Sequence, residues 1–328
     1  MYVYRDIPFE VIWRFGWKNI LRFIGYGTFI CFLHAFLITK GIHIHIPFSL
    51  IGPIGVAVAI YAGFKNSQSY DRTWEARKNW GSLAGATRIF ANHLNIYLNT
   101  EGKKDIAVLV NRQIAVLQAH KLQLRKRNQH SRQFDASTKK YYFGEPSEHD
   151  WQQEVAARLL DGEYDQVNNK NNRALQLLYK QLEHIHRLFM EKKLDEYKYV
   201  EVVNNLQTCI ETMGKNDRIK TTPFPRQYAF FSTWFIIIFI LILPFGILDL
   251  YKEPTLFVYV AVCLIYTLVS WLYSTMELVG NHSEDPFEHF ITDIPMSAII
   301  RTVEIDLFEL FDLQPKPDKT QAVNGILM

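Results

Sequence analysis

Two long runs without an ionisable side chain constrain this sequence more than any other feature. Residues 228–248 and 254–276 contain no Asp, Glu, Lys, Arg or His. At a rise of about 1.5 Å per residue, each run is long enough to cross a hydrocarbon core of roughly 30 Å as a helix. The connection at 249–253 is so short that the two helices must be antiparallel. We therefore expect a transmembrane hairpin over 227–276.

The N-terminal third predicts another hairpin over 23–64. Its first span, about 23–39, is interrupted only by His34, and its second, about 46–64, carries no charge. A cleaved signal peptide is the alternative for the first span, but the segment ends without an Ala-x-Ala-like cleavage site. We expect a retained helix, and hence four transmembrane helices in the chain.

The average composition conceals these spans. With a mean hydropathy of −0.07 and 48% hydrophobic residues, the 328-residue chain has the averages of an ordinary soluble protein. Its aromatic and aliphatic content excludes a disordered chain, and only three cysteines exclude a disulfide scaffold. The neutral average is the sum of strongly apolar spans and a polar remainder.

Positive charge is distributed unevenly between the segments that connect the spans. The proposed outer connections, 40–45 and 249–253, carry one lysine each, whereas 65–226 carries most of the 36 lysines and arginines. Because positively charged segments are retained on the cytoplasmic side, 65–226 is predicted to be cytoplasmic. The same bias places the N-terminal segment 1–22 and the C-terminal segment 277–328 on that side.

The predicted cytoplasmic region carries helical periodicity. Apolar residues recur at steps of three and four within 175–189 and within 203–213, and another helix is expected around 113–127. Packing inside a helical bundle is favoured over a coiled coil, because neither stripe is sustained over several heptads. The basic run 121–127 is typical of a solvated face or a lipid headgroup contact rather than of nucleic-acid binding. Strand signals are few, so an all-α membrane protein is predicted.

Motifs of enzymes and metal sites are missing from the sequence. No phosphate-binding glycine loop, nucleophile elbow or zinc-protease motif occurs, so we expect neither an enzyme nor a cofactor. Two histidine pairs have too few ligands for a metal site, and the cysteines are expected to be packing residues. These residues are His43 and His45, His184 and His186, and Cys31, Cys209 and Cys263.

The second predicted span contains three bulky apolar residues at intervals of four. Val56, Ile60 and Phe64 therefore lie in one row on the surface of a helix, between small residues such as Gly55 and Gly63. Close helix packing is the usual purpose of small residues in membranes, and the pattern alone favours it. The other interpretation is a hydrophobic constriction that faces the centre of a symmetric ring.

Three groups of residues, in order along the chain, resemble motifs of the bacterial bestrophin homologues. They are Pro47-Phe48-Ser49-Leu50 followed by Gly63-Phe64-Lys65-Asn66 and Ser69-Tyr70-Asp71-Arg72; Thr222-Pro223-Phe224-Pro225 with Tyr228; and Glu284-Asp285-Pro286-Phe287 followed by Asp293-Ile294-Pro295. The resemblance covers nearly the whole chain apart from about 98–151 and the C-terminal tail.

The bestrophin resemblance implies a homopentameric ion channel in the bacterial inner membrane, with its pore on the five-fold axis. Chloride or other small monovalent ions and the lipid bilayer are the implied partners. The resemblance also favours the constriction, because Val56, Ile60 and Phe64 occupy the positions of the family's hydrophobic neck. Alignment places the cytoplasmic aperture near Lys198, for which an ordinary surface lysine is the alternative.

One position departs from the animal bestrophins, which bind Ca²⁺ with an acidic run. Here Glu288 and Asp293 are acidic, but Phe290 and Ile291 replace acidic positions, so we expect no calcium site. The sequence leaves a cation-selective channel and a membrane-anchored sensor module open as alternatives. A secondary transporter is disfavoured, because the two hairpins share no evident similarity.

Overall fold

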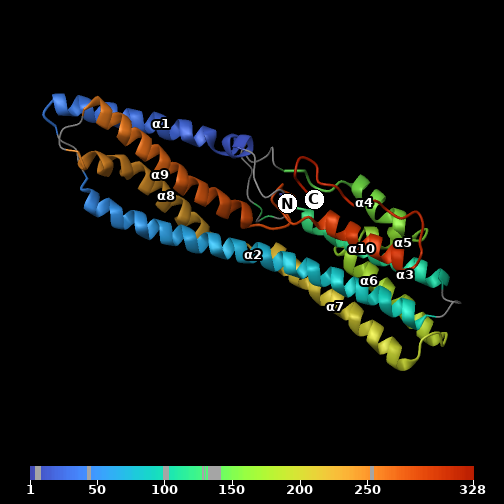
Figure 1. Cartoon of the computed structure of the whole chain (residues 1–328). Coiled ribbons are helices and arrows are strands. Elements are labelled where there is room, and N and C mark those ends of the chain that lie inside the picture. Colours follow the sequence, from blue (N-terminus) through green and yellow to red (C-terminus); the bar gives the residue numbers. More distant parts are fainter. Residues whose placement is uncertain are drawn as a thin grey trace. The chain divides into compact units, whose positions relative to one another are not determined.

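The computed structural model describes residues 1–3, 9–42, 46–98, 103–127, 129, 131, 142–251 and 255–328 (Figure 1). Across these residues the regular structure is helical, and β-pairing is limited to isolated bridges. The all-α prediction is therefore confirmed. The elements are α1 (Phe9–Thr39), α2 (Phe48–Tyr97), α3 (Lys103–Arg125), α4 (Glu148–Glu154), the 3₁₀ turn η3 (Ala156–Arg158), α5 (Glu163–Asn168), α6 (Arg173–Met190), α7 (Glu196–Thr221), α8 (Arg226–Asp249), α9 (Leu256–Ser283) and α10 (Met296–Leu310).

Four helices, α1, α2, α8 and α9, are long and apolar enough to cross a membrane. Each overlaps one span expected from the sequence, in the expected order, and α2 continues without a break past the expected end of its span at 64. The chain divides into two compact units. We call them the span unit, the described residues of Tyr4–Asp71 and Phe224–Glu284, and the polar unit, which comprises Met1–Val3, Arg72–Pro223 and Asp285–Met328.

In the span unit, α9 packs along both α1 and α8 (Figure 1). The contact with α1 is antiparallel, since Gly16 approaches Trp271 at one end and His34 lies against Tyr259 at the other. His34, the one ionisable residue of the first predicted span, shares a 3.1 Å hydrogen bond between its Nδ1 and the Tyr259 hydroxyl. This bond explains how a polar ring is tolerated within an apolar helix.

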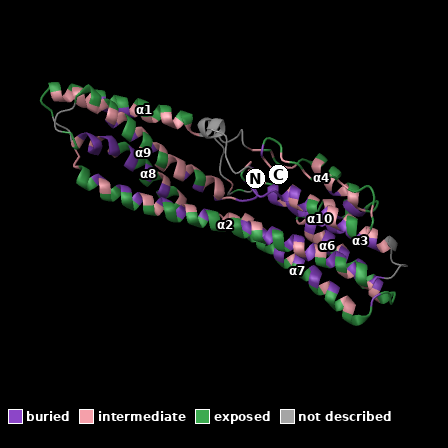
Figure 2. Ribbon diagram, viewed as in Figure 1, coloured by how far each residue is buried: buried purple, intermediate pink, exposed green. Residues whose placement is uncertain are grey.

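The polar unit is a helical bundle centred on α3, which packs against α6, α7 and α10. The three helices expected around 113–127, 175–189 and 203–213 are confirmed as α3, α6 and α7. Their buried residues form one apolar cluster; α6 and α7 each keep an exposed face, whereas the described residues of α3 are buried or half-buried on every side (Figure 2). The stripes seen in the sequence thus belong to a bundle core.

Helix α2 is a single helix of 50 residues that contributes to both units. Within the span unit its buried residues recur at steps of four and three, so one face of α2 is packed throughout (Figure 2). These buried residues are Ile51, Gly55, Val58, Ala62, Lys65 and Ser69. The opposite face of the same helix is exposed, and it carries the row identified from the sequence.

Two glycines of α1 offer a matched test of the α1–α9 contact. A Cβ atom at Gly27 would lie 2.8 Å from the buried ring of Tyr266, whereas nothing lies within 4 Å of one at Gly25. Gly27→Ala should therefore lower the free energy of unfolding by about 1–3 kcal/mol through overpacking. Gly25→Ala should be neutral or slightly stabilising. Equal midpoints of thermal unfolding in detergent for the two variants would contradict this packing.

Candidate functional site

The row Val56, Ile60 and Phe64 lies on the exposed face of α2. The three side chains are 61%, 56% and 64% exposed in the isolated chain, although they are large and apolar. On the packed face, by contrast, Val58 and Ala62 are buried in the apolar core of the span unit. The structure thus places the three predicted residues together, pointing away from the rest of the span unit.

Contacts with α8 and α9 determine which face of α2 is packed. A Cβ atom at Gly55 would lie 2.8 Å from the Phe239 ring of α8, and the Tyr273 hydroxyl of α9 donates a 2.9 Å hydrogen bond to the Gly55 carbonyl. Gly246 of α8 likewise leaves room for the Ile51 side chain. Gly55 therefore serves close packing, as the sequence pattern suggested, whereas Gly63 is exposed with nothing within 4 Å of an added Cβ, and the bulky row remains unpacked.

Polar residues flank the apolar row at both ends of the exposed face. Ser49 lies seven residues before Val56, and Ser67 and Gln68 follow Phe64; all three are exposed. Asp71, two helical turns beyond Phe64, is exposed on the same face. A surface that is polar, then apolar, then polar again along one helix can line an aqueous path with a dry constriction.

Lys198 lies in the first turn of α7, whose N-cap is Asp195. The Lys198 ammonium lies 2.9 Å from the Asp195 carboxylate, and the Lys198 backbone N–H donates a 3.0 Å hydrogen bond to it. Hydrogen bonds from Lys198 hold the pKa of Asp195 below its usual range, so this carboxylate is ionised at neutral pH. The predicted aperture lysine is thus partly neutralised within its own chain, while the adjacent Tyr197 is 89% exposed.

The acidic segment after Pro286 is used for internal hydrogen bonding. The buried Asp293 carboxylate accepts hydrogen bonds from the backbone N–H groups of Phe287, His289 and Ile294 at 2.7–2.9 Å. Phe287 and His289 have positive φ values of 74° and 63°, a conformation unfavourable for large residues that these bonds support. Asp293 therefore holds a strained loop in place.

Glu288 also has hydrogen-bond partners within the polar unit. Its Oε1 accepts hydrogen bonds from the Lys220 ammonium at 2.6 Å and from the Ser131 hydroxyl at 2.7 Å. Among the residues that the structure describes, no group of three or more His, Cys, Asp or Glu side chains is arranged to hold a metal ion.

The other candidate ligands have structural partners. His184 shares hydrogen bonds with Arg112 and Asp105, and His186 lies 3.4 Å from the Tyr199 hydroxyl. His43 and His45 lie outside the described residues. Cys31, Cys209 and Cys263 are free thiols.

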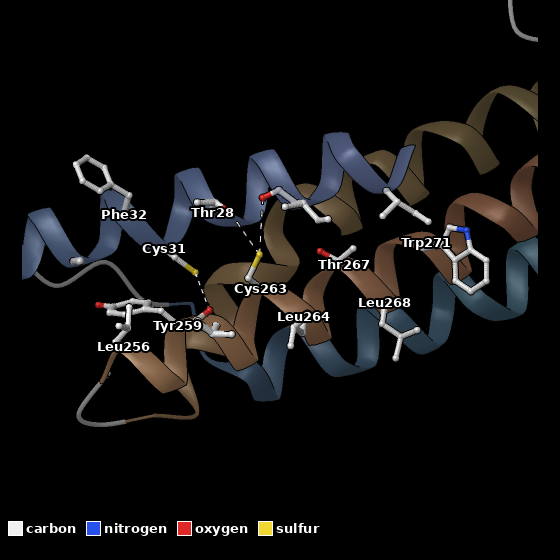
Figure 3. Close-up of a pocket in the computed structure, with 14 residues that line it drawn as sticks. Thr28, Cys31, Phe32, Leu256, Tyr259, Cys263, Leu264, Thr267, Leu268 and Trp271 are labelled. Atoms are coloured by element: carbon white, nitrogen blue, oxygen red, sulfur yellow. Dashed lines mark hydrogen bonds between the residues drawn. The ribbon is translucent and has the colours of Figure 1, made fainter. Parts of the chain in front are cut away.

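A groove of about 630 Å³ lies between α1 and α9 (Figure 3). The Cys31 and Cys263 sulfurs both point into the space between the two helices, where Cys31 Sγ lies 3.7 Å from the Tyr259 carbonyl oxygen. None of the lining residues is charged, and most are aliphatic or aromatic. Such a surface suits hydrocarbon chains and is a poor path for ions.

Comparison with known proteins decides the family. The sequence pattern described as "Bacterial/Fungal Bestrophin protein" matches residues 12–309, almost the whole chain. The chain belongs to the bacterial and fungal bestrophin family. The predicted resemblance is thereby confirmed, and the bestrophin assignment indicates an ion channel rather than an enzyme.

Individual relatives and a solved structure match most of the chain. A voltage-dependent anion channel-forming protein of Nostoc is 25% identical over 87% of this chain and 86% of that protein. A protein of the same description from Salmonella typhi is 29% identical over 83% and 79%. The crystal structure of a bacterial bestrophin homologue from Klebsiella pneumoniae covers 93% of this chain and 100% of its own, with a TM-score of 0.75 and 23% identity. This last likeness establishes the fold.

One pair of residues beside the row was not anticipated from the sequence. Lys65, immediately after Phe64, is buried and forms an ion pair with Glu277 of α9. In the sequence, Lys65 and Glu277 each stand at the end of an uncharged run. Charged residues that flank a membrane span in water stand at the same position, so the sequence did not distinguish the two cases.

Calcium should not stabilise this protein, since most oxygens of the acidic segment already have partners in the chain. A hard cation needs roughly six to eight oxygen ligands, and both oxygens of Asp293 and the Oε1 of Glu288 accept hydrogen bonds from the chain. Millimolar CaCl₂ should therefore shift the midpoint of thermal unfolding no more than MgCl₂ does. A rise specific to calcium that EDTA reverses would contradict this reading of the segment.

Proposed function

We propose that this protein is the subunit of a homopentameric channel that conducts small monovalent ions, with chloride and other anions preferred. The observation that carries the proposal is the row Val56, Ile60 and Phe64, which is exposed on a face of α2 with polar residues at both ends. Around a five-fold axis, five copies of this face would enclose a path with three apolar rings. The descriptions of the relatives as anion channel-forming proteins support an anion as the conducted ion.

In this proposal the apolar rings act as a neck. An ion that passes them exchanges water for hydrocarbon, so a narrow apolar segment resists conduction unless it is wide enough to remain hydrated. Truncating the side chains widens the path and favours its hydration. The neck itself carries no charge and does not choose between anions and cations by its own field.

Selectivity in this proposal arises at charged positions away from the neck. A ring of Lys198 ammonium groups at the cytoplasmic aperture would attract anions, with Asp195 reducing its strength. Asp71 favours the second candidate, a cation-selective channel, because it is exposed on the same face of α2 as the neck. The sign of the reversal potential in a salt gradient discriminates between the two.

The proposed orientation follows the distribution of positive charge. Both termini and residues 65–226 face the cytoplasm, and the chain crosses the inner membrane of a bacterium four times. The segments of this proposal are 1–22, the hairpin 23–64, the helical region 65–226, the hairpin 227–276, and 277–328.

Truncating the neck should increase ion flux. In liposomes that contain the purified protein, Ile60→Ala and Phe64→Ala should raise chloride flux several-fold above that of the unmodified protein. Val58→Ala is the matched control, because it removes an apolar side chain from the packed face of the same helix. The result that contradicts the neck is equal flux from Phe64→Ala and Val58→Ala. Absence of flux from every pure assembly would instead favour a membrane-anchored sensor module.

Charge changes at the aperture should alter selectivity in opposite directions. Lys198→Glu should move the reversal potential in a NaCl gradient toward the sodium equilibrium potential, because it replaces a ring of positive charge with negative charge. Asp195→Asn should move it toward the chloride potential, since asparagine preserves the N-cap but removes the counter-charge.

The matched control for the aperture is Lys215→Glu, which makes the same charge change at an exposed position further along α7. If Lys215→Glu and Lys198→Glu shift the reversal potential equally, Lys198 does not line the aperture.

A further inference from the structure

The residue that follows the neck is a buried lysine. Phe64 is 64% exposed, whereas the side chain of Lys65 is 0% exposed. Successive residues of a helix are separated by about 100° around its axis, so the two side chains leave α2 in clearly different directions. A lysine at the end of a membrane span can ordinarily extend its ammonium group toward water. Lys65 instead points into the span unit.

The ammonium group of Lys65 meets two acceptors of α9. Its Nζ donates to Glu277 Oε1 at 2.7 Å and to Asn281 Oδ1 at 2.5 Å. The pair joins residues that are 212 positions apart in the chain, so it is a tertiary contact between α2 and α9.

Helix α8 completes the environment of Glu277. The Ser232 hydroxyl donates to Glu277 Oε2 at 2.9 Å, and the Thr233 hydroxyl donates to Oε1 at 2.5 Å. Asn281 adds a longer hydrogen bond of 3.3 Å from its Nδ2 to Oε1. Both carboxylate oxygens are thus satisfied, and three helices meet at one buried charge pair.

A pair of this kind is better suited to fixing orientation than to adding stability. Removing two charges from water is costly, and well-packed apolar residues often give equal or greater stability at the same place. Directional hydrogen bonds, however, are lost if α2 rotates, which leaves a buried charge without a partner. Asn66 adds a steric restraint, because its side chain lies so close to Gly280 that a Cβ atom there would overlap its Oδ1.

We propose that Lys65 and Glu277 are positioning residues of the neck. Their ion pair fixes the rotation of α2 about its own axis and thereby holds Phe64 toward the conduction path. The neck then widens through side-chain changes of Phe64 itself, or through movement of α2, α8 and α9 together, and not through rotation of α2 alone. This inference rests on the proposed channel function.

Cysteine accessibility tests the orientation directly. In a protein without its three native cysteines, Phe64→Cys and Ala62→Cys would be reacted with a charged methanethiosulfonate reagent in reconstituted liposomes. Ala62 is 1% exposed, so the cysteine at 64 should react much faster than that at 62. Adding Lys65→Met should reduce the ratio of the two rates by at least about tenfold, because the unpaired Glu277 no longer specifies one orientation.

Chloride flux in single and double variants provides a second test. A merely structural role would give independent effects of Lys65→Met and Phe64→Ala. Lys65→Met should change chloride flux in the unmodified background but have little further effect in Phe64→Ala, since the pair acts through the phenylalanine. Lys18→Met, at an exposed lysine of α1, is the control and should leave both readouts unchanged. If Lys65→Met does not assemble, Glu277→Gln removes the charge while preserving the shape of the side chain.

Two outcomes overturn the proposal in different ways. An unchanged ratio of reactivity in Lys65→Met or Glu277→Gln, with a reactive cysteine at 64 in the parent protein, rejects the positioning role and leaves the channel function intact. An unreactive cysteine at 64 in the parent protein rejects the neck itself, and the positioning proposal with it.

Discussion

The packing of one face of α2 against α8 and α9 is the constraint that determines which face of this helix is left exposed. Gly55 admits the Phe239 ring, Ile51 fits against Gly246, and Lys65 binds Glu277. Each contact uses the same side of α2, so the row Val56, Ile60 and Phe64 on the other side stays exposed in the isolated chain. An apolar row that is exposed in this way must face lipid, contact another copy of the chain or line a pore.

The position of the Lys65–Glu277 ion pair explains why a membrane protein can retain a buried lysine and glutamate. The pair lies where the apolar row ends and polar residues begin, and every oxygen of Glu277 has a donor. A polar contact at this level specifies one rotation of the helix, whereas apolar packing alone tolerates several. The exposure of the row Val56, Ile60 and Phe64 and the geometry of the ion pair are therefore two consequences of the same helix orientation.

Much of this fold could be predicted from the sequence, because the absence of charge over about twenty residues permits few structures other than a membrane helix. The row Val56, Ile60 and Phe64 could be predicted as one helix face from its spacing, but its exposure depends on partners in α8 and α9. The Lys65–Glu277 pair could not be predicted, since its two residues are 212 positions apart and each resembles a solvated flank. The hydrogen bonds from backbone groups to Asp293 could not be predicted either, because almost every residue has a backbone donor and the sequence does not show which of them a carboxylate binds.

The orientation of the apolar row in the assembled protein is the central claim, and it is open to direct observation. A single-particle reconstruction of the protein in lipid nanodiscs would measure both the number of subunits and the direction of each Phe64 side chain. We expect five-fold symmetry, with Val56, Ile60 and Phe64 forming three rings around the axis. An assembly in which this row faces lipid, or is buried between neighbouring subunits away from any central path, would contradict it.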